Sequence, residues 1–300
     1  MPEHSGPLTM AAADRGPAEG GDRPVWRIRD RTIHLGRPVV VGILNVTPDS
    51  FSDGGAYLDP SLAAERAHAL AADGADLIDI GGESTRPGAR AVSADEEWFR
   101  VGPVLERLQG SIPVPLAVDT TKADVARRAL DLGVAVLNDV SGLAADPRLA
   151  ILAAETGAGL VLMHMRGEPR TMQENVEYRD LLGEIRDGLS SSLRLAIEAG
   201  CAPAQLVVDP GIGFGKSAQG NLRLLAELGE LLALGRPVLV GPSRKSFIGT
   251  VLDLPVQDRV EGTVAACVMA LERGARLFRV HDVREVRRAL DLADSIRRAG

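Results

Sequence analysis

The chain has 300 residues, of which 45% are hydrophobic, so it holds enough apolar side chains for one large domain or two small ones. Its net charge of −7, with no long basic run, argues against a nucleic-acid or anionic-membrane surface. Only 3% of the residues are aromatic, which predicts an aliphatic core and disfavours a β-sandwich or a base-stacking protein.

The first 23 residues have the composition of a disordered tail, because Gly, Pro, Ala and charged residues dominate and no apolar segment interrupts them. No apolar run reaches the ~18 residues that a membrane helix needs. Cys201 and Cys267 are isolated from each other, which is typical of reduced thiols rather than of a disulfide framework. We therefore expect a cytoplasmic protein with a tail at 1–23 and one folded domain at 24–300.

Short apolar runs recur along the folded part of the chain. Val25–Ile28 and Thr32–Leu35 flank a charged turn and predict a small hairpin. Eight nearly continuous apolar runs follow, which is the pattern of parallel strands covered on both faces. They are Val39–Leu44, Asp76–Ile80, Val114–Val118, Val134–Leu137, Gly159–Met163, Gln205–Val208, Pro237–Val240 and Leu277–Val280.

Helical patterns separate these runs. They cover Ser61–Ala72, Asp95–Leu108, Thr121–Leu132, Pro147–Glu155, Tyr178–Ala199, Asn221–Leu232, Val260–Arg273 and Val283–Arg298. Thr121 and Asp124 have capping-box spacing at the start of the third helix. Strands alternating with helices predict a single (β/α)₈ barrel, an α/β fold. The alternative, a doubly wound sheet, usually carries a Gly-rich fingerprint after its first strand, whereas here that strand leads into Asn45-Val46-Thr47-Pro48-Asp49.

Polar residues follow almost every predicted strand. They are Asn45, Asp79, Asp119, Asn138, His164, Asp209, Ser243 with Lys245, and His281. In a barrel these positions surround one mouth, where barrel active sites lie. Each also has a structural interpretation: Asp79 and Asp119 can cap the next helix, and one of Asn138 and Asp139 is expected to be structural. His164 can equally be a core histidine.

Three loops have the composition of lids or ligand clamps. They are Asn45–Gly55, Glu83–Gly88 and Asp209–Lys216, the last of which can alternatively be a plain phosphate nest. Lysine is rare among the 34 basic residues, which leaves Lys122, Lys216 and Lys245 as candidates for positions where Arg does not fit.

Arg279 and His281 lie two residues apart, so they share one side of the last strand and can hold one anion together. The helix that begins at Val283 can add its N-terminal N–H groups to the same site. The alternative is an inward Arg279 paired with an acid of the barrel.

From about Val39 onward the chain resembles the dihydropteroate synthase family. The resemblance rests on NVTPDSFSDGG, DIGGESTRPG, VDTTKADV, LNDVSG, LMHMRG, DPGIGFGK, GPSRKSFIG and RVHDV, in that order. Small departures are Ile212, Pro242 and Ala123-Asp124, none of which removes a functional side chain. The tail lies outside the resemblance.

The resemblance implies a (β/α)₈ barrel that uses Mg²⁺, a dihydropterin diphosphate and p-aminobenzoate. It makes Asn45 a Mg²⁺ ligand and places Arg86, Arg279 and His281 on the diphosphate. Asp119, Asn138, Asp209 and Lys245 would hold the pterin, and Thr85, Pro87, Phe214 and Ser243 would border p-aminobenzoate. Asp79, from the polar ring, completes the substrate-binding candidates. The expected catalytic residues are Asp119, Lys245, Arg279 and His281.

The implied chemistry is departure of diphosphate followed by attack of the arylamine on the pterin methylene, which yields 7,8-dihydropteroate. One alternative is a corrinoid-type pterin methyltransferase domain, which would lack the first loop and the Arg-x-His pair. Another is a catalytically silent pterin-binding paralogue. Family members commonly pair as homodimers through the outer helices of the later repeats. The segment Val260–Leu271, apolar over much of its circumference, fits such a contact unless neighbouring helices cover it.

Overall fold

The computed structural model describes residues 24–47 and 59–300, apart from 87, 169 and 175. Its main sheet has eight parallel strands in the order β8-β7-β6-β5-β4-β3-β10-β9. A parallel bridge between Val208 and Val238 joins the two ends of this order and closes the barrel, as predicted. The strands are β3 (Val39–Asn45), β4 (Leu77–Gly81), β5 (Leu116–Asp119), β6 (Val136–Asp139), β7 (Gly159–Met163), β8 (Leu206–Asp209), β9 (Leu239–Val240) and β10 (Leu277–Val280).

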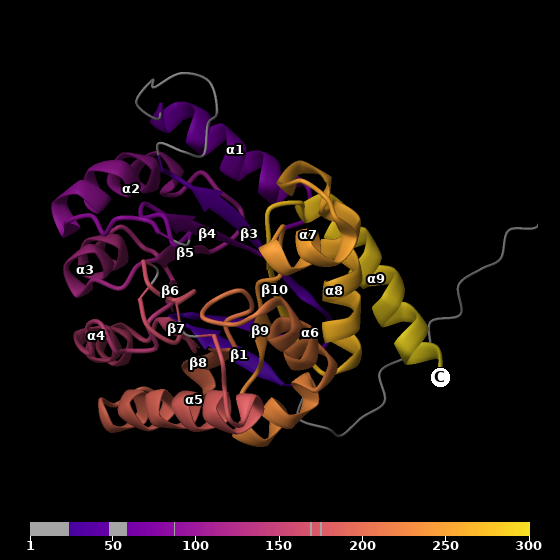
Figure 1. The fold of residues 1–300 in the computed structure, drawn as a ribbon. Coiled ribbons are helices and arrows are strands. Elements are labelled where there is room, and N and C mark those ends of the chain that lie inside the picture. The colour runs from indigo at the N-terminus through magenta and orange to yellow at the C-terminus, as the bar shows by residue number, and fades with distance from the viewer. Residues whose placement is uncertain (1–23, 48–58, 87, 169, 175) are drawn as a thin grey trace, which may run out of the picture.

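Helices surround the barrel on its outer side (Figure 1). They are α1 (Pro60–Ala72), α2 (Ala94–Leu108), α3 (Ala123–Asp131), α4 (Arg148–Thr156), α5 (Leu181–Glu198), α6 (Ala218–Ala226), α7 (Ser246–Leu252), α8 (Val260–Glu272) and α9 (Val283–Ala299). Short 3₁₀ helices lie at Pro203–Gln205, Leu228–Leu234 and Val256–Asp258. No helix within these described ranges has the length and hydropathy to cross a membrane.

The predicted hairpin forms and joins the apolar layer at the N-terminal end of the barrel. β1 (Val25–Ile28) pairs antiparallel with β2 (Arg31–His34). Trp26 and Ile28 are fully buried in the same cluster as inward residues of the strands. The Trp26 indole donates to the carbonyl of Gln205 at 2.8 Å, and a Cβ at Gly159 would lie 2.9 Å from the Trp26 ring. The hairpin therefore covers the barrel end opposite to the predicted site.

Strand alternation divides the core into two layers. Outward residues such as Ile78, Leu137 and Phe278 pack with the helices in one large cluster. Inward residues such as Leu77, Val136 and Leu277 pack with the hairpin in a second cluster. Because both faces of each strand are apolar, the strands show no alternation of polar and apolar residues in the sequence.

One divided helix, one helix cap and one additional helix differ from the sequence prediction. The predicted helix Asn221–Leu232 is divided at Glu227, where α6 ends and a 3₁₀ helix follows. The predicted Thr121 capping box is wrong, because α3 begins after Lys122 without a side-chain cap of its own. Asp146, from the β6–α4 connection, accepts instead from the Ala123 N–H at 3.0 Å. The sequence also gave no signal for α7.

The predicted disordered tail, residues 1–23, lies outside the described residues, and so does most of the predicted lid at Asn45–Gly55. His34 and His68 are exposed, and Cys267 is buried in the core.

Candidate active site

A layer of polar side chains lies across the barrel interior, next to the inward apolar layer. Each member follows an inward apolar residue by two positions, so both side chains face the same way. The pairs are Leu77 with Asp79, Ala117 with Asp119, Val136 with Asn138, Val207 with Asp209, and Leu277 with Arg279. Closure of the barrel thus brings together residues from five strands, as the sequence prediction required.

Arg279 is the centre of this layer. Its Nε donates to Asp79 Oδ2 at 2.5 Å, and its Nη2 donates to Asp119 Oδ2 at 2.7 Å. Asn138 Nδ2 donates to the same Asp79 oxygen at 2.9 Å. The alternative interpretation of Arg279, an inward Arg paired with barrel acids, therefore describes its contacts in this structure. That Arg279 and His281 together hold an anion stays a prediction. Asp79 and Asp119 bind Arg279 and do not cap helices.

Burial dominates the electrostatics of Asp119. Desolvation raises the pKa of this carboxyl to about 7, although Arg279 opposes the shift. Arg279 stays charged, because Asp79 and Asp119 raise its pKa in spite of burial. The charge of Asp119 therefore depends on a cationic partner, and a second cation nearby would favour its ionised form.

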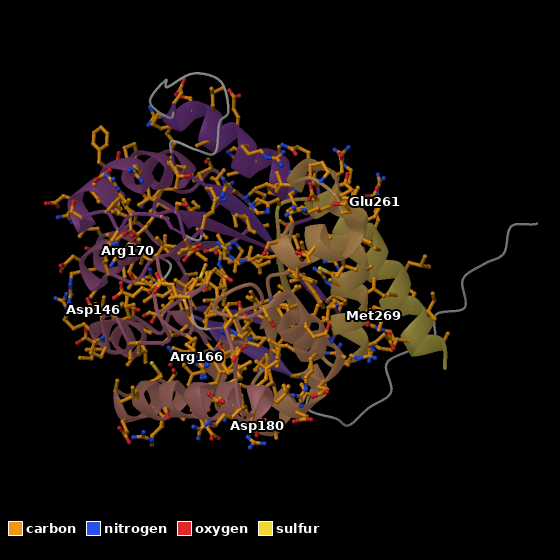
Figure 2. All side chains as sticks on the ribbon, viewed as in Figure 1. Asp146, Arg166, Arg170, Asp180, Glu261 and Met269 are labelled. Carbon is orange, nitrogen blue, oxygen red and sulfur yellow. The ribbon has the colours of Figure 1, made fainter. Side chains whose placement is uncertain are left out.

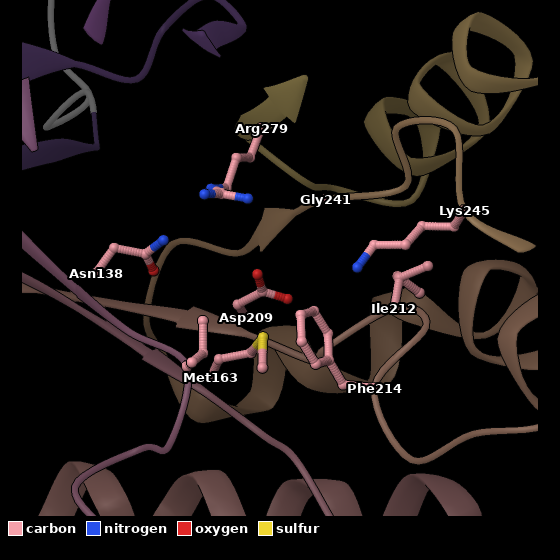
Figure 3. Close-up of a pocket in the computed structure, with 9 residues that line it drawn as sticks. Asn138, Met163, Asp209, Ile212, Phe214, Gly241, Lys245 and Arg279 are labelled. Atoms are coloured by element: carbon pink, nitrogen blue, oxygen red, sulfur yellow. The ribbon is translucent and has the colours of Figure 1, made fainter. Parts of the chain in front are cut away.

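A cavity of about 300 Å³, partly open to solvent, adjoins the polar layer at the mouth of the barrel (Figure 3). Its lining combines polar groups with flat and branched apolar ones: Asn138, Val140, Met163, Asp209, Ile212, Phe214, Gly241, Lys245 and Arg279. Lys245 Nζ lies 3.9 Å from the centre of the Phe214 ring. Such a cavity suits a flat ring with hydrogen-bonding edges.

Two lining residues have pKa values shifted by burial. The pKa of Asp209 is raised to about 6, although its hydrogen bond from the Gly211 N–H and the nearby Lys245 lower it. The pKa of Lys245 is lowered to about 8, with Arg279 adding to the desolvation and Asp209 opposing it. The cavity thus offers a carboxyl and an amine that both titrate near neutral pH.

These values predict how ligand binding depends on pH. A dihydropterin donates hydrogen bonds that favour the carboxylate of Asp209, so bound ligand lowers its pKa and binding releases protons. Calorimetric affinity for 6-hydroxymethyl-7,8-dihydropterin should be full above the pKa of about 6 and weaken as the pH falls through it. Asp209→Asn should bind more weakly with a flatter profile. Equal affinity across this range in the unmodified protein would contradict the prediction.

A second group of polar residues lies beside the cavity. His281 Nδ1 is 3.0 Å from Ser243 Oγ, and its Nε2 is 3.4 Å from Asn45 Nδ2. Burial and the nearby Arg279 lower the pKa of His281 to about 4, so the ring is neutral without an anion present. Ser243, predicted to border p-aminobenzoate, here orients His281. The structure thus places Asn45, Ser243 and His281 in one chain of contacts.

The donor set at this place fits Mg²⁺ only as an ion shared with a substrate. Within the described ranges, no cluster of three or more His, Cys, Asp or Glu side chains could hold a metal. Asn45 is half-buried and offers a hard amide oxygen. Mg²⁺ commonly keeps several waters and takes one or two protein ligands plus phosphate oxygens, which such a site can provide.

The sequence interpretation missed a charged cluster formed by Glu83, Glu97 and Lys122. Lys122 Nζ donates to Glu97 Oε2 at 2.6 Å and also to Glu83, whose Oε1 accepts from the Val92 N–H at 3.1 Å. Burial lowers the pKa of Lys122, but the hydrogen bonds to both carboxylates outweigh it and raise the pKa. Glu83 thus connects the two ends of segment 83–92 through its hydrogen bond with the Val92 N–H. The signal in the sequence was Lys122 itself, one of the few lysines.

The segment held by this cluster carries two predicted substrate residues. Thr85 is half-buried, whereas Arg86 is exposed and its guanidinium has no partner among the described residues. Pro87, the third predicted residue here, lies outside the described residues. His164, predicted as part of the ring, does not line the cavity and contacts Lys216 instead.

Comparison with known proteins agrees with this geometry. A family described as "Pterin binding enzyme" matches residues 41–281, so the barrel and its site are those of a pterin-binding enzyme. The dihydropteroate synthase of Synechocystis sp. is 48% identical over 261 residues, which cover 87% of this chain and 90% of that protein. The chain belongs to the dihydropteroate synthase family.

Solved structures give the same result. Dihydropteroate synthase from Yersinia pestis, in a sulfonamide drug complex, is 45% identical with a TM-score of 0.87, covering 91% of this chain and 99% of that one. The Xanthomonas albilineans enzyme in complex with 7,8-dihydropteroate is 41% identical with a TM-score of 0.81, covering 90% and 98%. The similarity therefore spans the whole barrel.

Proposed function

We propose that this protein condenses (7,8-dihydropterin-6-yl)methyl diphosphate with p-aminobenzoate to give 7,8-dihydropteroate and pyrophosphate. Its relatives are transferases of folate biosynthesis, and one solved relative holds 7,8-dihydropteroate. The observation that carries the proposal is the cavity, where Asn138, Asp209 and Lys245 lie near the Met163 side chain and the flat Phe214 ring, beside Arg279.

Polar residues of the cavity bind the edge of the pterin ring, and apolar residues cover its faces. Asp209 accepts from the donor-rich amidine edge, whereas Asn138 both donates and accepts. Lys245 is a compact donor whose Nζ lies 3.9 Å from the centre of the Phe214 ring, whereas Arg would bring a broader planar fork to the same place. The apolar residues Met163 and Phe214 cover the ring faces.

When the bond to the diphosphate breaks, a positive and a negative charge form, and different polar residues stabilise each of them. As the methylene C–O bond breaks, positive charge develops on the pterin methylene and the diphosphate gains negative charge. Asp119 stabilises the cation, and Arg279 and His281 stabilise the departing anion. The arylamine nitrogen is already nucleophilic when neutral, so no strong base is needed for its attack. Arg86, from the segment held by Glu83, adds a second guanidinium to the anion.

Mg²⁺ is proposed as the metal, with Asn45 as its protein ligand and diphosphate oxygens as the others. A Mg²⁺ ion held there would neutralise negative charge on the leaving group. The protein's part is to orient the Asn45 amide, which His281 contacts at 3.4 Å.

An assay with the pterin diphosphate, p-aminobenzoate and Mg²⁺ tests the proposed reaction. It should release one pyrophosphate for each 7,8-dihydropteroate formed. The control omits p-aminobenzoate, which separates synthesis from plain hydrolysis. No pyrophosphate above background would refute the proposed function.

We expect ordered binding of the two substrates. Segment 83–92 carries Thr85 and Arg86, whose guanidinium has no partner among the described residues. In the proposed reaction the diphosphate binds Arg86 and completes the neighbouring p-aminobenzoate site. Calorimetry should show p-aminobenzoate binding at least ~10-fold more tightly, ~1.4 kcal/mol, when pterin, pyrophosphate and Mg²⁺ are present. Equal affinity with and without them would mean that the site is preformed.

We also propose a homodimer that uses the outer face of α8. Most of this helix packs against α9, α6 and α7, which accounts for much of its apolar surface. Met269 remains 46% exposed and lies at the outer edge of the barrel (Figure 2). Light scattering should give twice the chain mass, and Met269→Glu should shift the protein toward monomer. A monomer mass at every concentration would remove the proposal.

A further inference from the structure

In the DPGIGFGK loop between β8 and α6, backbone carbonyl oxygens point toward one common position. Gly211, Gly213 and Gly215 all have positive φ, of 71°, 83° and 62°, which a side chain would disfavour. The Lys216 ammonium lies at that point, 2.8 Å from the Phe214 carbonyl, 3.0 Å from that of Gly211 and 3.3 Å from that of His164. It is also 3.3 Å from His164 Nδ1.

The loop is therefore not a phosphate nest. The N–H of Gly211 donates to Asp209 Oδ1 at 2.7 Å, and that of Gly213 donates to Asn221 Oδ1 at 2.7 Å. Neither N–H is free for an anion. The carbonyl oxygens, which carry partial negative charge, point at a cation.

Lys216 is buried to an unusual degree for a lysine without a carboxylate partner. Only 2% of Lys216 is exposed, and its ammonium forms no ion pair with any carboxylate of the described residues. An ammonium has three N–H donors, and the carbonyls and the His164 ring account for all of them. Burial lowers the pKa of Lys216 to about 7, with Asp209 opposing the shift. Without this cation, buried carbonyls would face each other unpaired, which is costly.

The loop held in this way forms one wall of the cavity. Phe214, whose carbonyl binds Lys216, contributes its ring to the cavity lining. Gly213 lies against Lys245, since a Cβ there would be 2.8 Å from the Lys245 Cδ atom. The position of Lys216 thus sets the positions of Phe214 and Lys245, although Lys216 itself does not line the cavity.

We propose that Lys216 is a positioning residue whose ammonium fills a carbonyl-lined cation site and thereby places Phe214 and Lys245 at the substrate cavity. Removal of the side chain leaves a site lined by carbonyl oxygens, which are suitable ligands for NH₄⁺ or K⁺. The inference goes beyond the proposed function and rests on it only where activity is the readout.

The test compares Lys216→Ala, which opens the site, with Lys216→Met, which fills it with an uncharged chain of similar length. Both are measured in tetramethylammonium chloride and in ammonium or potassium chloride at equal ionic strength. Tetramethylammonium is too large for the site and donates no hydrogen bond. Arg284→Leu, which removes an exposed cation paired with Asp73 outside this loop, serves as the control.

We expect Lys216→Ala to lose at least ~10-fold in kcat/KM in tetramethylammonium, mainly through KM for both substrates, and to recover most of it in ammonium or potassium. Lys216→Met should lose as much without recovery. Activity of either variant within twofold of the unmodified protein, equal recovery of both, or no recovery of Lys216→Ala would overturn the proposal.

Thermal unfolding gives a readout that does not need the proposed reaction. Ammonium should raise the Tm of Lys216→Ala more than the Tm of the unmodified protein, Lys216→Met or Arg284→Leu. If Lys216→Ala does not fold in tetramethylammonium, ammonium should restore folding, and failure to do so would also overturn the proposal. An inactive unmodified protein would refute the proposed function and leave this thermal test valid.

Discussion

Asp119→Ala is expected to slow synthesis strongly while leaving the barrel folded. Asp119 binds Arg279, and in the proposed mechanism it also stabilises the developing cation. Its removal therefore withdraws a charge-assisted partner from a buried site, which commonly costs ~2–4 kcal/mol. Initial rates should show kcat/KM lower by roughly 30-fold to 1000-fold. Affinity for the dihydropterin should fall as well.

A neighbouring acid provides the control for this variant. Asp124 lies in the first turn of α3 and is exposed, with 61% of its side chain accessible. Asp124→Ala should keep kcat/KM within twofold of the unmodified protein. If Asp119→Ala did the same, Asp119 would have only a structural role and the proposed mechanism would lose its cation-stabilising residue.

Arg279→Leu is expected to be both inactive and unstable. The substitution leaves Asp79 and Asp119 buried without their shared cation, and breaking a buried ion pair on one side costs about 3–5 kcal/mol. Asp79 Oδ1 already has no hydrogen-bond partner among the described residues, so the layer has no spare donor to compensate. Urea unfolding should report this loss in free energy of unfolding.

Two further variants test whether the loss of stability comes from the buried charges. In the double variant Asp79→Asn with Arg279→Leu, one of the stranded charges is gone, so stability should return in part while activity stays lost. Arg284→Leu removes an exposed Arg that pairs with Asp73, and such a surface pair contributes ~1 kcal/mol or less. An Arg279→Leu protein as stable as Arg284→Leu would show that the ion-pair layer does not support the fold.

Local patterns in the sequence were sufficient for the barrel. The run from Leu277 to Val280 is apolar on both faces apart from Arg279, and β10 has the same bounds in the structure. The polar residues at strand ends were equally predictable, because Asp119 and Asn138 extend an inward-facing register that apolar residues begin. The motif resemblance added the chemistry, which composition and spacing alone did not define.

Pairings between distant segments were not predictable in the same way. Arg279 binds acids that precede it by 200 and 160 positions, so strand alternation could orient its side chain but could not choose between an anion and these carboxylates. Asp146 replaced the predicted Thr121 cap because the neighbouring β6–α4 connection reaches the helix end.

The three lysines show what the sequence determines and what only the tertiary structure determines. The sequence by itself marked Lys122, Lys216 and Lys245 as unusual in a chain that otherwise uses Arg. Only the tertiary structure decided their different partners: two carboxylates for Lys122, backbone carbonyls for Lys216, and an aromatic ring for Lys245. Residue type limits what a side chain can bind, whereas the partner depends on which distant segments the closed barrel brings within hydrogen-bonding distance.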